Sequence, residues 1–252
     1  MIVARTATEL QRLRRSGLVV HQVLQEVVQA VRPGLSTWDL EEVADRAIRS
    51  QGATSAFRGY RGFPCVLCAS VNDEVVHGIP ARKRILKDGD IVSLDCGVVL
   101  DGYYGDAATT VVVGDAAVLP AAVRKLLAAT QESLAAGIDC ARPGGYLGDI
   151  SHAVQARVEA AGFSVVREFV GHGIGTHLHE DPQIPNFGNR GAGQRLREGM
   201  VLAIEPMVNE KGAGVRVLSD GWTAVTADGG RSAHFEHTVA VTKDGPWILT
   251  QP

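Results

Sequence analysis

The sequence has 252 residues, of which 45% are apolar and 21% charged, and its formal net charge is −3. A chain of this length buries enough surface for a full hydrophobic core. The small net charge gives no reason to expect nucleic-acid specificity. No stretch of about 18 apolar residues occurs, and the N-terminus lacks the apolar core of a signal peptide. We therefore expect a globular protein of the cytoplasm that does not bind a membrane.

Four cysteines, too few for a disulfide framework in a chain of this size, stand at Cys65, Cys68, Cys96 and Cys140. Cys65 and Cys68 form a C-x-x-C pair within a predicted strand. Residues i and i+3 of a strand point to opposite faces, so this pair cannot share a metal ion there. We interpret both as buried apolar residues; a redox or zinc role is the alternative.

The first predicted elements are two helices followed by strands. An apolar stripe runs through the first helix at Leu13, Val20, Leu24, Val27 and Val31. A second helix spans about 38–50, capped by Ser36 or Thr37 and ended by Gly52. Strands are predicted at 64–71, 91–99 and 103–113. Helices at 121–136 and 147–162 then precede strands at 164–170, 200–208, 214–218 and 234–242.

Three features of the first helix pair recur 110 residues later in the second. They are Arg32-Pro33-Gly34 and Arg142-Pro143-Gly144, Asp39 and Asp149, and Gly52 and Gly162. Chance recurrence of helix stops is the alternative to duplication. We predict a single α+β domain over 1–252, with halves of roughly 1–113 and 114–252 related by an approximate two-fold. Each half places a helix pair on a shared, curved antiparallel sheet.

Two aspartates lie inside apolar strands of the first half. Asp101-Gly102 is a strong hairpin signal, and a turn there places Gly97 opposite Asp106. Asp95 then becomes the diagonal neighbour of Asp106 on the same face, about 7–8 Å away at the backbone. Either aspartate alone could be exposed or paired with an arginine. Two unpaired charges in a core would cost several kcal/mol, so the pair points to bound cations.

The second half carries the same anomaly. Glu205 ends an otherwise apolar strand, Glu236 begins another, and His172 lies in a glycine-rich segment that we expect to be a flexible loop. A lone histidine would be interpreted as structural, but beside four misplaced carboxylates it is a candidate ligand. This donor set carries too much negative charge for a single zinc ion. It suits two divalent cations, of Mn, Fe, Co or Zn, and therefore hydrolysis by an activated water.

With these residues the chain resembles a known family, the type I methionine aminopeptidases of the short bacterial kind, from about Leu10 to Leu249. The resemblance is carried by Gly59-Tyr-Arg-Gly-Phe-Pro64, Cys68-Ala-Ser-Val-Asn-Asp-Glu-Val-Val-His-Gly-Ile-Pro80, Ser93-Leu-Asp-Cys-Gly97, Gly105-Asp106, Gly171-His-Gly-Ile-Gly175, His179-Glu-Asp-Pro182, Ala203-Ile-Glu-Pro-Met207 and Phe235-Glu-His-Thr238. It implies the pita-bread fold. It also implies removal of the N-terminal methionine from nascent proteins, favoured when the second residue is small and uncharged.

The resemblance also implies roles for individual residues. One metal would be held by Asp95, Asp106 and Glu236, and the other by Asp106, Glu236, His172 and Glu205. Glu205 would in addition relay a proton from water to the leaving amine. Two further histidines, His77 and His179, would contact the substrate and stabilise the tetrahedral intermediate.

A methionine pocket is implied as well, lined by Tyr60, Phe63, Cys68, Leu178 and Trp222. Phe57 and Leu178 stand where relatives vary, so the apolar character of this pocket is better defined than its shape. The remaining histidines receive no role beyond structure: His21, His152, His177, His234 and His237.

Two other functions fit parts of this pattern. A proline-specific peptidase of the same fold shares all five ligands, but such enzymes usually carry an additional N-terminal domain. A binding module that has lost its metals should have substituted a ligand, and none is substituted here. The sequence leaves open the physiological metal and any contact with the ribosome; a monomer is the default expectation.

Overall fold

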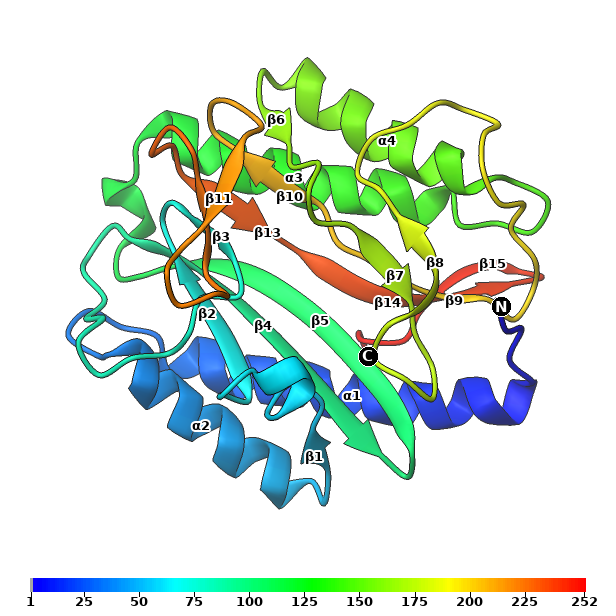
Figure 1. Cartoon of the computed structure of the whole chain (residues 1–252), viewed down its shortest axis with the longest axis horizontal. Coiled ribbons are helices and arrows are strands. Elements are labelled where there is room, and N and C mark those ends of the chain that lie inside the picture. The colour runs from blue at the N-terminus through cyan, green and yellow to red at the C-terminus, as the bar shows by residue number, and fades with distance from the viewer. Residues whose placement is uncertain (1) are drawn as a thin grey trace.

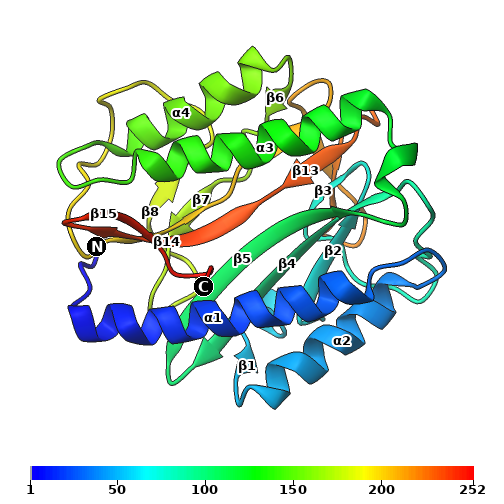
Figure 2. The same cartoon turned by 180° about the vertical axis from the view of Figure 1, so that it is seen from behind.

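The computed structural model describes residues 2–252 and contains four long helices on one face of a curved sheet (Figures 1 and 2). The helices are α1 (Ala7–Ala30), α2 (Thr37–Ser50), α3 (Ala121–Asp139) and α4 (Leu147–Ala160), with short 3₁₀ turns at η1 (Tyr60–Gly62) and η2 (Ala116–Val118). Within this part of the chain, none of the helices combines the length and the apolar character needed to cross a bilayer. The pair α1 and α2 packs on the first half of the sheet, and α3 and α4 cover the second.

Side-chain caps define where the helices begin. At α1, Glu9 accepts a hydrogen bond from the Thr6 N–H at 2.8 Å, while the Thr6 hydroxyl accepts one from the Glu9 N–H at 3.3 Å. At α2, Asp39 likewise accepts from the Ser36 N–H at 2.7 Å. Ser36 is therefore the cap of the second helix, and Thr37 is its first residue. Such caps satisfy amide groups that would otherwise lack a partner.

The main sheet has nine strands in the order β1-β4-β5-β14-β9-β7-β8, with β2 paired to β4 and β15 paired to β14. Their bounds are β1 (Thr54–Ser55), β2 (Leu67–Val71), β4 (Ile91–Leu100), β5 (Tyr103–Val112), β7 (Gly171–Gly173), β8 (Glu180–Ile184), β9 (Val201–Ile204), β14 (Glu236–Thr242) and β15 (Gly245–Ile248). The predicted hairpin is confirmed: Leu100 pairs with Tyr103 and Gly97 with Asp106.

Two three-stranded sheets complete the fold. One joins β13 (Ser232–His234), β10 (Met207–Asn209) and β6 (Ser164–Val165), and the other joins β11 (Val215–Val217), β12 (Ala224–Thr226) and β3 (Glu74–Val76). The first packs against α3 and α4, whereas β3 and β11 lie toward the viewer in Figure 1, on the side that the helices leave open. This side carries the candidate site.

Several predicted strands were wrong in extent. The strand expected at 200–208 is two strands separated by Glu205 and Pro206, because proline has no N–H to continue the ladder. The strand expected at 234–242 is likewise divided at Phe235, and the one expected at 164–170 covers Ser164–Val165 alone. The loop expected around His172 is in fact strand β7.

The 110-residue repeat extends to backbone contacts. The Gly34 N–H donates to the Leu86 carbonyl at 2.9 Å, and the Gly144 N–H donates to the Leu196 carbonyl at 3.0 Å. The isolated bridge between Ser36 and Ile85 recurs between Tyr146 and Arg195. Each helix pair is therefore tied to its half of the sheet by the same connections, as expected for pseudo-symmetric halves. The limits of the halves, 1–113 and 114–252, stay a prediction.

Candidate metal centre

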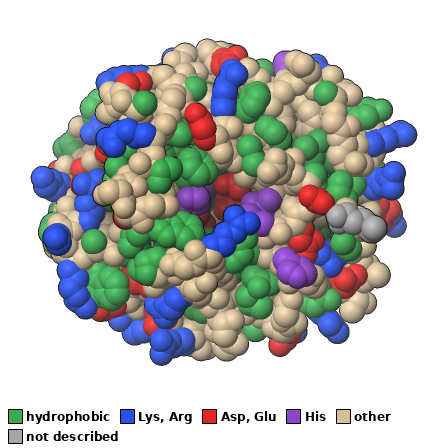
Figure 3. Space-filling view, in the orientation of Figure 1, with side chains coloured by type: hydrophobic (Ala, Val, Ile, Leu, Met, Phe, Trp, Pro, Cys, Tyr) green, Lys and Arg blue, Asp and Glu red, His purple; other side chains and the backbone are tan. Residues whose placement is uncertain are grey.

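The five predicted ligands meet at the floor of one cavity of about 280 Å³ on the open face of the sheet. Figure 3 shows this hollow, with acidic side chains at its base and histidines at its edge. The cavity is lined by Asp95, Asp106, His172, Glu205 and Glu236, and by Phe57, Tyr60, Arg61, Phe63, Cys68, His77, Phe169, Leu178, His179 and Trp222.

Sheet register brings the carboxylates together. Ala108 of β5 pairs with Asp95 of β4 on one side and with Glu236 of β14 on the other. Asp95 and Glu236 therefore lie in one row across three strands, and Asp106 stands two residues from that row on the same face. His172 pairs with Ala203 of β9, the strand that Glu205 follows. The seam between the two halves thus runs through the site.

The side chains converge to within metal-binding distance. Ligand atoms of Asp106, His172 and Glu236 lie within 4.8 Å of one another, and all three residues are buried. His172 Nε2 lies 3.9 Å from Asp106 Oδ2 and 3.6 Å from Glu205 Oε1. Its Nδ1 is 2.9 Å from the Gly173 carbonyl, to which the ring N–H donates. In that tautomer the lone pair of Nε2 faces the carboxylates, as a metal ligand requires.

The glycines beside His172 serve close packing rather than flexibility. A β-carbon on Gly171 would lie 2.3 Å from the Ala203 carbonyl oxygen, and one on Gly173 would lie 2.1 Å from the Asp181 carbonyl oxygen. Both distances are far shorter than any normal contact. Only glycine lets β7 pack this closely between its neighbours, and this packing holds the His172 ring over the carboxylates.

The carboxylates repel one another and are shielded from water. Burial raises the pKa of Asp95 to about 7 and that of Glu205 to about 8. Burial, followed by the charges of the neighbouring carboxylates, raises the pKa of Asp106 and Glu236 well above their usual range. The buried oxygens Asp95 Oδ1, Asp106 Oδ1 and Glu236 Oε1 have no hydrogen-bond partner. Unpartnered anionic oxygens in one place are what divalent cations would satisfy, so the residues fit a metal centre.

The histidines around the floor are held in the neutral form. Burial lowers the pKa of His172 to about 3 and that of His77 to about 4. Burial and then the charge of Arg61 lower the pKa of His179. His179 Nδ1 lies 2.8 Å from the Tyr60 hydroxyl. If that hydroxyl donates to Nδ1, the Nε2–H of His179 is left free to donate into the cavity.

All five residues predicted for the methionine pocket line the same cavity as the carboxylates. Phe63, Cys68 and Leu178 are buried, and the rings of Phe63 and Trp222 meet edge to face with centroids 5.1 Å apart. Cys68 pairs with Asp95 across β2 and β4, so the apolar wall begins directly beside the carboxylates. Both Cys65 and Cys68 are buried and free, although Cys65 precedes β2 rather than lying within it.

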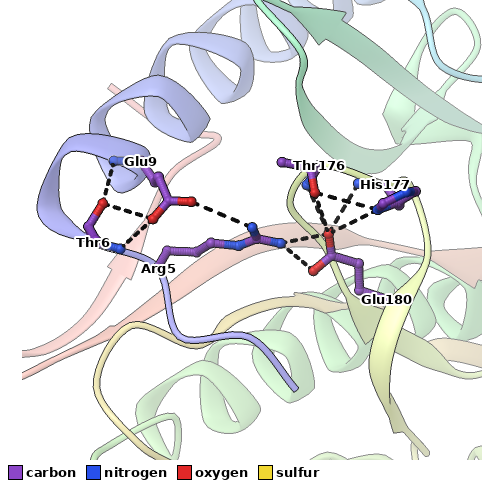
Figure 4. A network of polar contacts seen from close by, with 6 residues as sticks. All are labelled: Arg5, Thr6, Glu9, Thr176, His177 and Glu180. Carbon is purple, nitrogen blue, oxygen red and sulfur yellow. Dashed lines mark hydrogen bonds and ion pairs between the residues drawn. The ribbon is translucent and has the colours of Figure 1, made fainter. Parts of the chain in front are cut away.

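A polar network fixes the segment that carries His179 (Figure 4). The Glu180 carboxylate accepts backbone N–H bonds from Thr176 at 2.8 Å and His177 at 3.1 Å. The Arg5 guanidinium donates to both oxygens of Glu180, at 2.6 and 2.5 Å, and the Arg5 side chain is almost fully buried. The segment before α1 thereby anchors the loop next to the site.

Sequence reasoning did not include His234 in the site. Its Nε2 lies 3.4 Å from Glu205 Oε2, and this buried nitrogen has no hydrogen-bond partner. Glu205 therefore lies between two imidazoles, those of His172 and His234. One signal could have found it: His234 precedes Glu236 by two residues, the spacing that places side chains on one face of an extended chain. Arg61 and Phe169 also line the cavity without having been predicted.

Comparisons with known proteins agree with this geometry. Residues 11–243 match the family "Metallopeptidase family M24". The chain is 51% identical to methionine aminopeptidase 1 of Bacillus subtilis, covering 100% of both chains. It is 50% identical to the methionine aminopeptidase of Clostridium perfringens, covering 99% of each.

Among solved structures, the methionine aminopeptidase of Thermotoga maritima superposes with a TM-score of 0.97 at 47% identity, covering 100% of both chains. The prolidase of Pyrococcus furiosus matches 99% of this chain and 66% of its own, with a TM-score of 0.80 at 19% identity, which shows the shared fold alone. The predicted pita-bread fold is confirmed by these likenesses. The chain therefore belongs to metallopeptidase family M24 and, within it, to the methionine aminopeptidases.

Proposed function

We propose that this chain removes the N-terminal methionine from polypeptides by metal-dependent hydrolysis of the first peptide bond. The observation that carries the proposal is the shared cavity: the carboxylate and histidine cluster forms the floor, and Phe63 and Trp222 belong to the adjacent wall. Such a cavity can hold an unbranched apolar side chain next to a hydrolytic centre. Full-length identity of about 50% to proteins named methionine aminopeptidase supports the same conclusion.

Divalent metal use follows from the family and from the clustered donors. We assign Asp95, Asp106 and Glu236 to one cation, and Asp106, Glu236, His172 and Glu205 to a second, which makes Asp106 and Glu236 the bridging ligands. The unpartnered carboxylate oxygens support this assignment. When bound, Mn, Fe, Co or Zn ions supply Lewis acidity, which acidifies water and polarises a carbonyl group.

Glu205 is the proton carrier in this proposal. Water adds to the carbonyl carbon of the methionine residue, and Glu205 accepts the proton that this water loses. The carbon–nitrogen bond then breaks, and Glu205 delivers the proton to the nitrogen of the leaving peptide, so free methionine and a shortened peptide result. The imidazoles of His172 and His234 lie on either side of the Glu205 carboxylate, with Nε2 atoms 3.6 and 3.4 Å from its oxygens.

His77 and His179 act on the substrate in this proposal. Both line the cavity as neutral rings, so each can donate an N–H bond without carrying a charge of its own. The Tyr60 hydroxyl orients His179, and the Phe169 ring packs edge to face on His77 with centroids 5.4 Å apart. Donors held in this way stabilise the negative charge that develops on the carbonyl oxygen.

The oligomeric state and the second substrate residue belong to the same proposal. We infer that the enzyme acts as a monomer in the cytoplasm on nascent chains, and that it favours a small, uncharged second residue. The cavity is lined by residues of one chain, which supports the monomer, and the preference for a small second residue is what the resemblance to methionine aminopeptidases implies. Light scattering tests the monomer, and the rates for Met-Ala-Ser against Met-Leu-Ser test the preference for a small second residue.

The main experiment compares peptides on the reconstituted enzyme. Metal-free protein is loaded in turn with Mn²⁺, Fe²⁺, Co²⁺ and Zn²⁺, and release of methionine from Met-Ala-Ser is measured beside cleavage of an Xaa-Pro bond. We expect Met-Ala-Ser to be cleaved and the proline peptide to resist. Preference for the proline peptide would instead indicate a proline-specific peptidase of the same fold. Peptide binding without cleavage under every metal would indicate a binding module.

A further inference from the structure

A basic side chain without a carboxylate partner lies at the mouth of the cavity. Arg61 lines the cavity together with the floor residues, and it is exposed. Figure 3 shows a basic side chain across the edge of the hollow. Among residues 2–252, no carboxylate pairs with Arg61, whereas the nearby Arg58 pairs with Glu41 and Asp45, both at 2.8 Å. The positive charge of Arg61 is therefore available to a ligand.

The backbone of Arg61 is strained but well supported. Its φ of 49° and ψ of 23° lie in the left-handed region, which costs a residue with a β-carbon about 1 kcal/mol or more. The turn is closed by bonds from the Gly59 N–H to the Phe63 carbonyl at 2.8 Å and from the Phe63 N–H to the Tyr60 carbonyl at 2.9 Å. Glycine or asparagine would fit this position with less strain. A long cation kept there points to function rather than packing.

The guanidinium lies beside the residues proposed to act on the substrate. It stacks over the Tyr60 ring at 5.4 Å from the centroid, and the Tyr60 hydroxyl is 2.8 Å from His179 Nδ1. Arg61 is also close enough to His179 for its charge to lower the pKa of that imidazole. The stacking limits the positions that the guanidinium can take, which reduces the entropy lost when it binds an anion.

The geometry of the substrate decides what Arg61 would meet. Under the proposed function, on which this inference rests, the methionine is enclosed by the apolar wall and the scissile bond lies at the cavity floor. The rest of the peptide must leave through the mouth. We propose that Arg61 forms a subsite for a carboxylate on this leaving segment, namely an acidic side chain at the third or fourth residue of the substrate. Lysine or arginine at the same place would be repelled.

The test measures charge preference rather than activity alone. Steady-state rates are determined with the metal-loaded enzyme for amidated peptides Met-Ala-Xaa-Gly and Met-Ala-Gly-Xaa, where Xaa is Glu, Gln or Lys. An exposed ion pair changes binding by up to about fivefold, so we expect about a five- to tenfold spread in kcat/KM between Glu and Lys at the better position. The difference between the Glu and Lys peptides should appear in KM rather than in kcat, because the ion pair with Arg61 forms equally in the ground and transition states. It should shrink in about 0.5 M salt.

Variants assign the preference to one side chain. Arg61→Gln should reduce the difference in kcat/KM between the Glu and Lys peptides to within about twofold, and Arg61→Lys should restore part of it. Arg61→Asn also removes the charge, and asparagine adopts the left-handed backbone conformation more readily than arginine does. The same reduced difference in this variant would show that the effect does not come from misfolding. The matched control is Arg12→Gln, because Arg12 also stacks on an aromatic ring, that of Tyr103 at 5.6 Å, and does not line the cavity.

Each outcome decides a different point. A spread that persists in Arg61→Gln, or that shrinks equally in Arg12→Gln, would overturn the subsite, since the preference would then come from the overall charge. A preference seen only with a free C-terminal carboxylate, and not with amidated peptides, would overturn the assignment to an acidic side chain. If the Gln peptides are not cleaved at all, the proposed function fails and the inference fails with it.

Discussion

Glu205 is the residue on which the chemistry depends most. It is flanked by His172 Nε2 at 3.6 Å and His234 Nε2 at 3.4 Å, and burial raises its pKa to about 8. Glu205→Gln keeps the shape of the side chain but removes the proton acceptor. We expect kcat for Met-Ala-Ser to fall by about 100-fold or more, with the fold retained. Metal content measured on the same sample separates lost chemistry from lost metal, and unchanged kcat in metal-loaded protein would rule out the assigned role.

His234 gives a second prediction at this scale. Its buried Nε2 has no hydrogen-bond partner and lies 3.4 Å from Glu205 Oε2, so a small shift of either side chain would let the imidazole N–H donate to the carboxylate. His234→Leu should weaken metal binding by about 10- to 100-fold, the usual effect of losing a partner of a metal ligand. His234→Gln offers another N–H donor and should recover much of the loss. Competition with a chelator measures this, and equal affinities for all three proteins would contradict the role.

Local chemistry determined which residues could be predicted. Charges in apolar strands are anomalous in the sequence alone, so Asp95, Asp106, Glu205 and Glu236 could be recognised without a structure. His234 could not be recognised with equal ease, because a histidine is compatible with many structural settings. Arg61 was missed for a different reason: its importance lies in a cavity mouth formed by segments distant in sequence.

At the scale of elements, the Arg5–Glu180 pair links the segment before α1 to the loop that carries His179. Breaking such a pair leaves an uncompensated charge, and for a mostly buried pair this costs about 3–5 kcal/mol. Arg5→Gln should therefore lower the free energy of unfolding by several kcal/mol and reduce kcat/KM for Met-Ala-Ser. The matched control is Arg15→Gln, which removes an exposed pair with Asp101 and should change stability by less than about 1 kcal/mol.

Urea unfolding and steady-state kinetics on both variants check this prediction. Arg5 and Glu180 do not line the cavity, so a loss of activity in Arg5→Gln beyond any loss of folded protein would mean that the loop positions His179. If the two variants are equally stable and equally active, the network is not what holds the loop.

Elements with strong local signals were predicted well, and those determined by tertiary contacts were not. The β4–β5 hairpin follows from Asp101-Gly102, and the predicted pairs of Leu100 with Tyr103 and Gly97 with Asp106 are confirmed. Strand β7, by contrast, exists because Gly171 and Gly173 allow close approach to neighbouring backbone, which no local pattern reveals. The short strands β3, β8 and β12 were missed because three to five residues carry too little periodicity to identify a strand.

The whole molecule is organised around the seam where its halves meet. The first half supplies Asp95 and Asp106, and the second supplies His172, Glu205 and Glu236, with Ala108 and Glu236 paired directly across the seam. Separate hydrophobic clusters lie under the two helix pairs. The cluster of like charges therefore sits where the halves join, and its repulsion acts against their association unless cations are bound.

This repulsion gives a pH-dependent stability in the metal-free protein. The folded-state pKa of Asp95 is raised to about 7 and that of Glu205 to about 8, above their usual 3.8 and 4.5, so the folded state binds more protons than the unfolded state between those values. Histidines whose pKa is lowered on folding give the opposite slope, but only near their unfolded pKa of 6.5. Above about pH 7.5 they are almost entirely neutral in both states, so the carboxyls determine the sign of the slope there. The free energy of unfolding should fall as pH rises, by about 1.4 kcal/mol per pH unit for each excess proton.

Divalent cations should reverse this trend, because they bind the ionised carboxylates and so stabilise the folded state more as pH rises. Urea unfolding at three pH values from about 7.5 to 8.5, with EDTA or with Mn²⁺, measures both slopes. Glu205→Gln removes one of the titrating groups and should make the slope of the metal-free protein shallower. If the metal-free protein instead gains stability toward pH 8, the carboxylates are not protonated in the folded state. The charge at the seam would then be balanced by protein groups rather than by protons or metal ions.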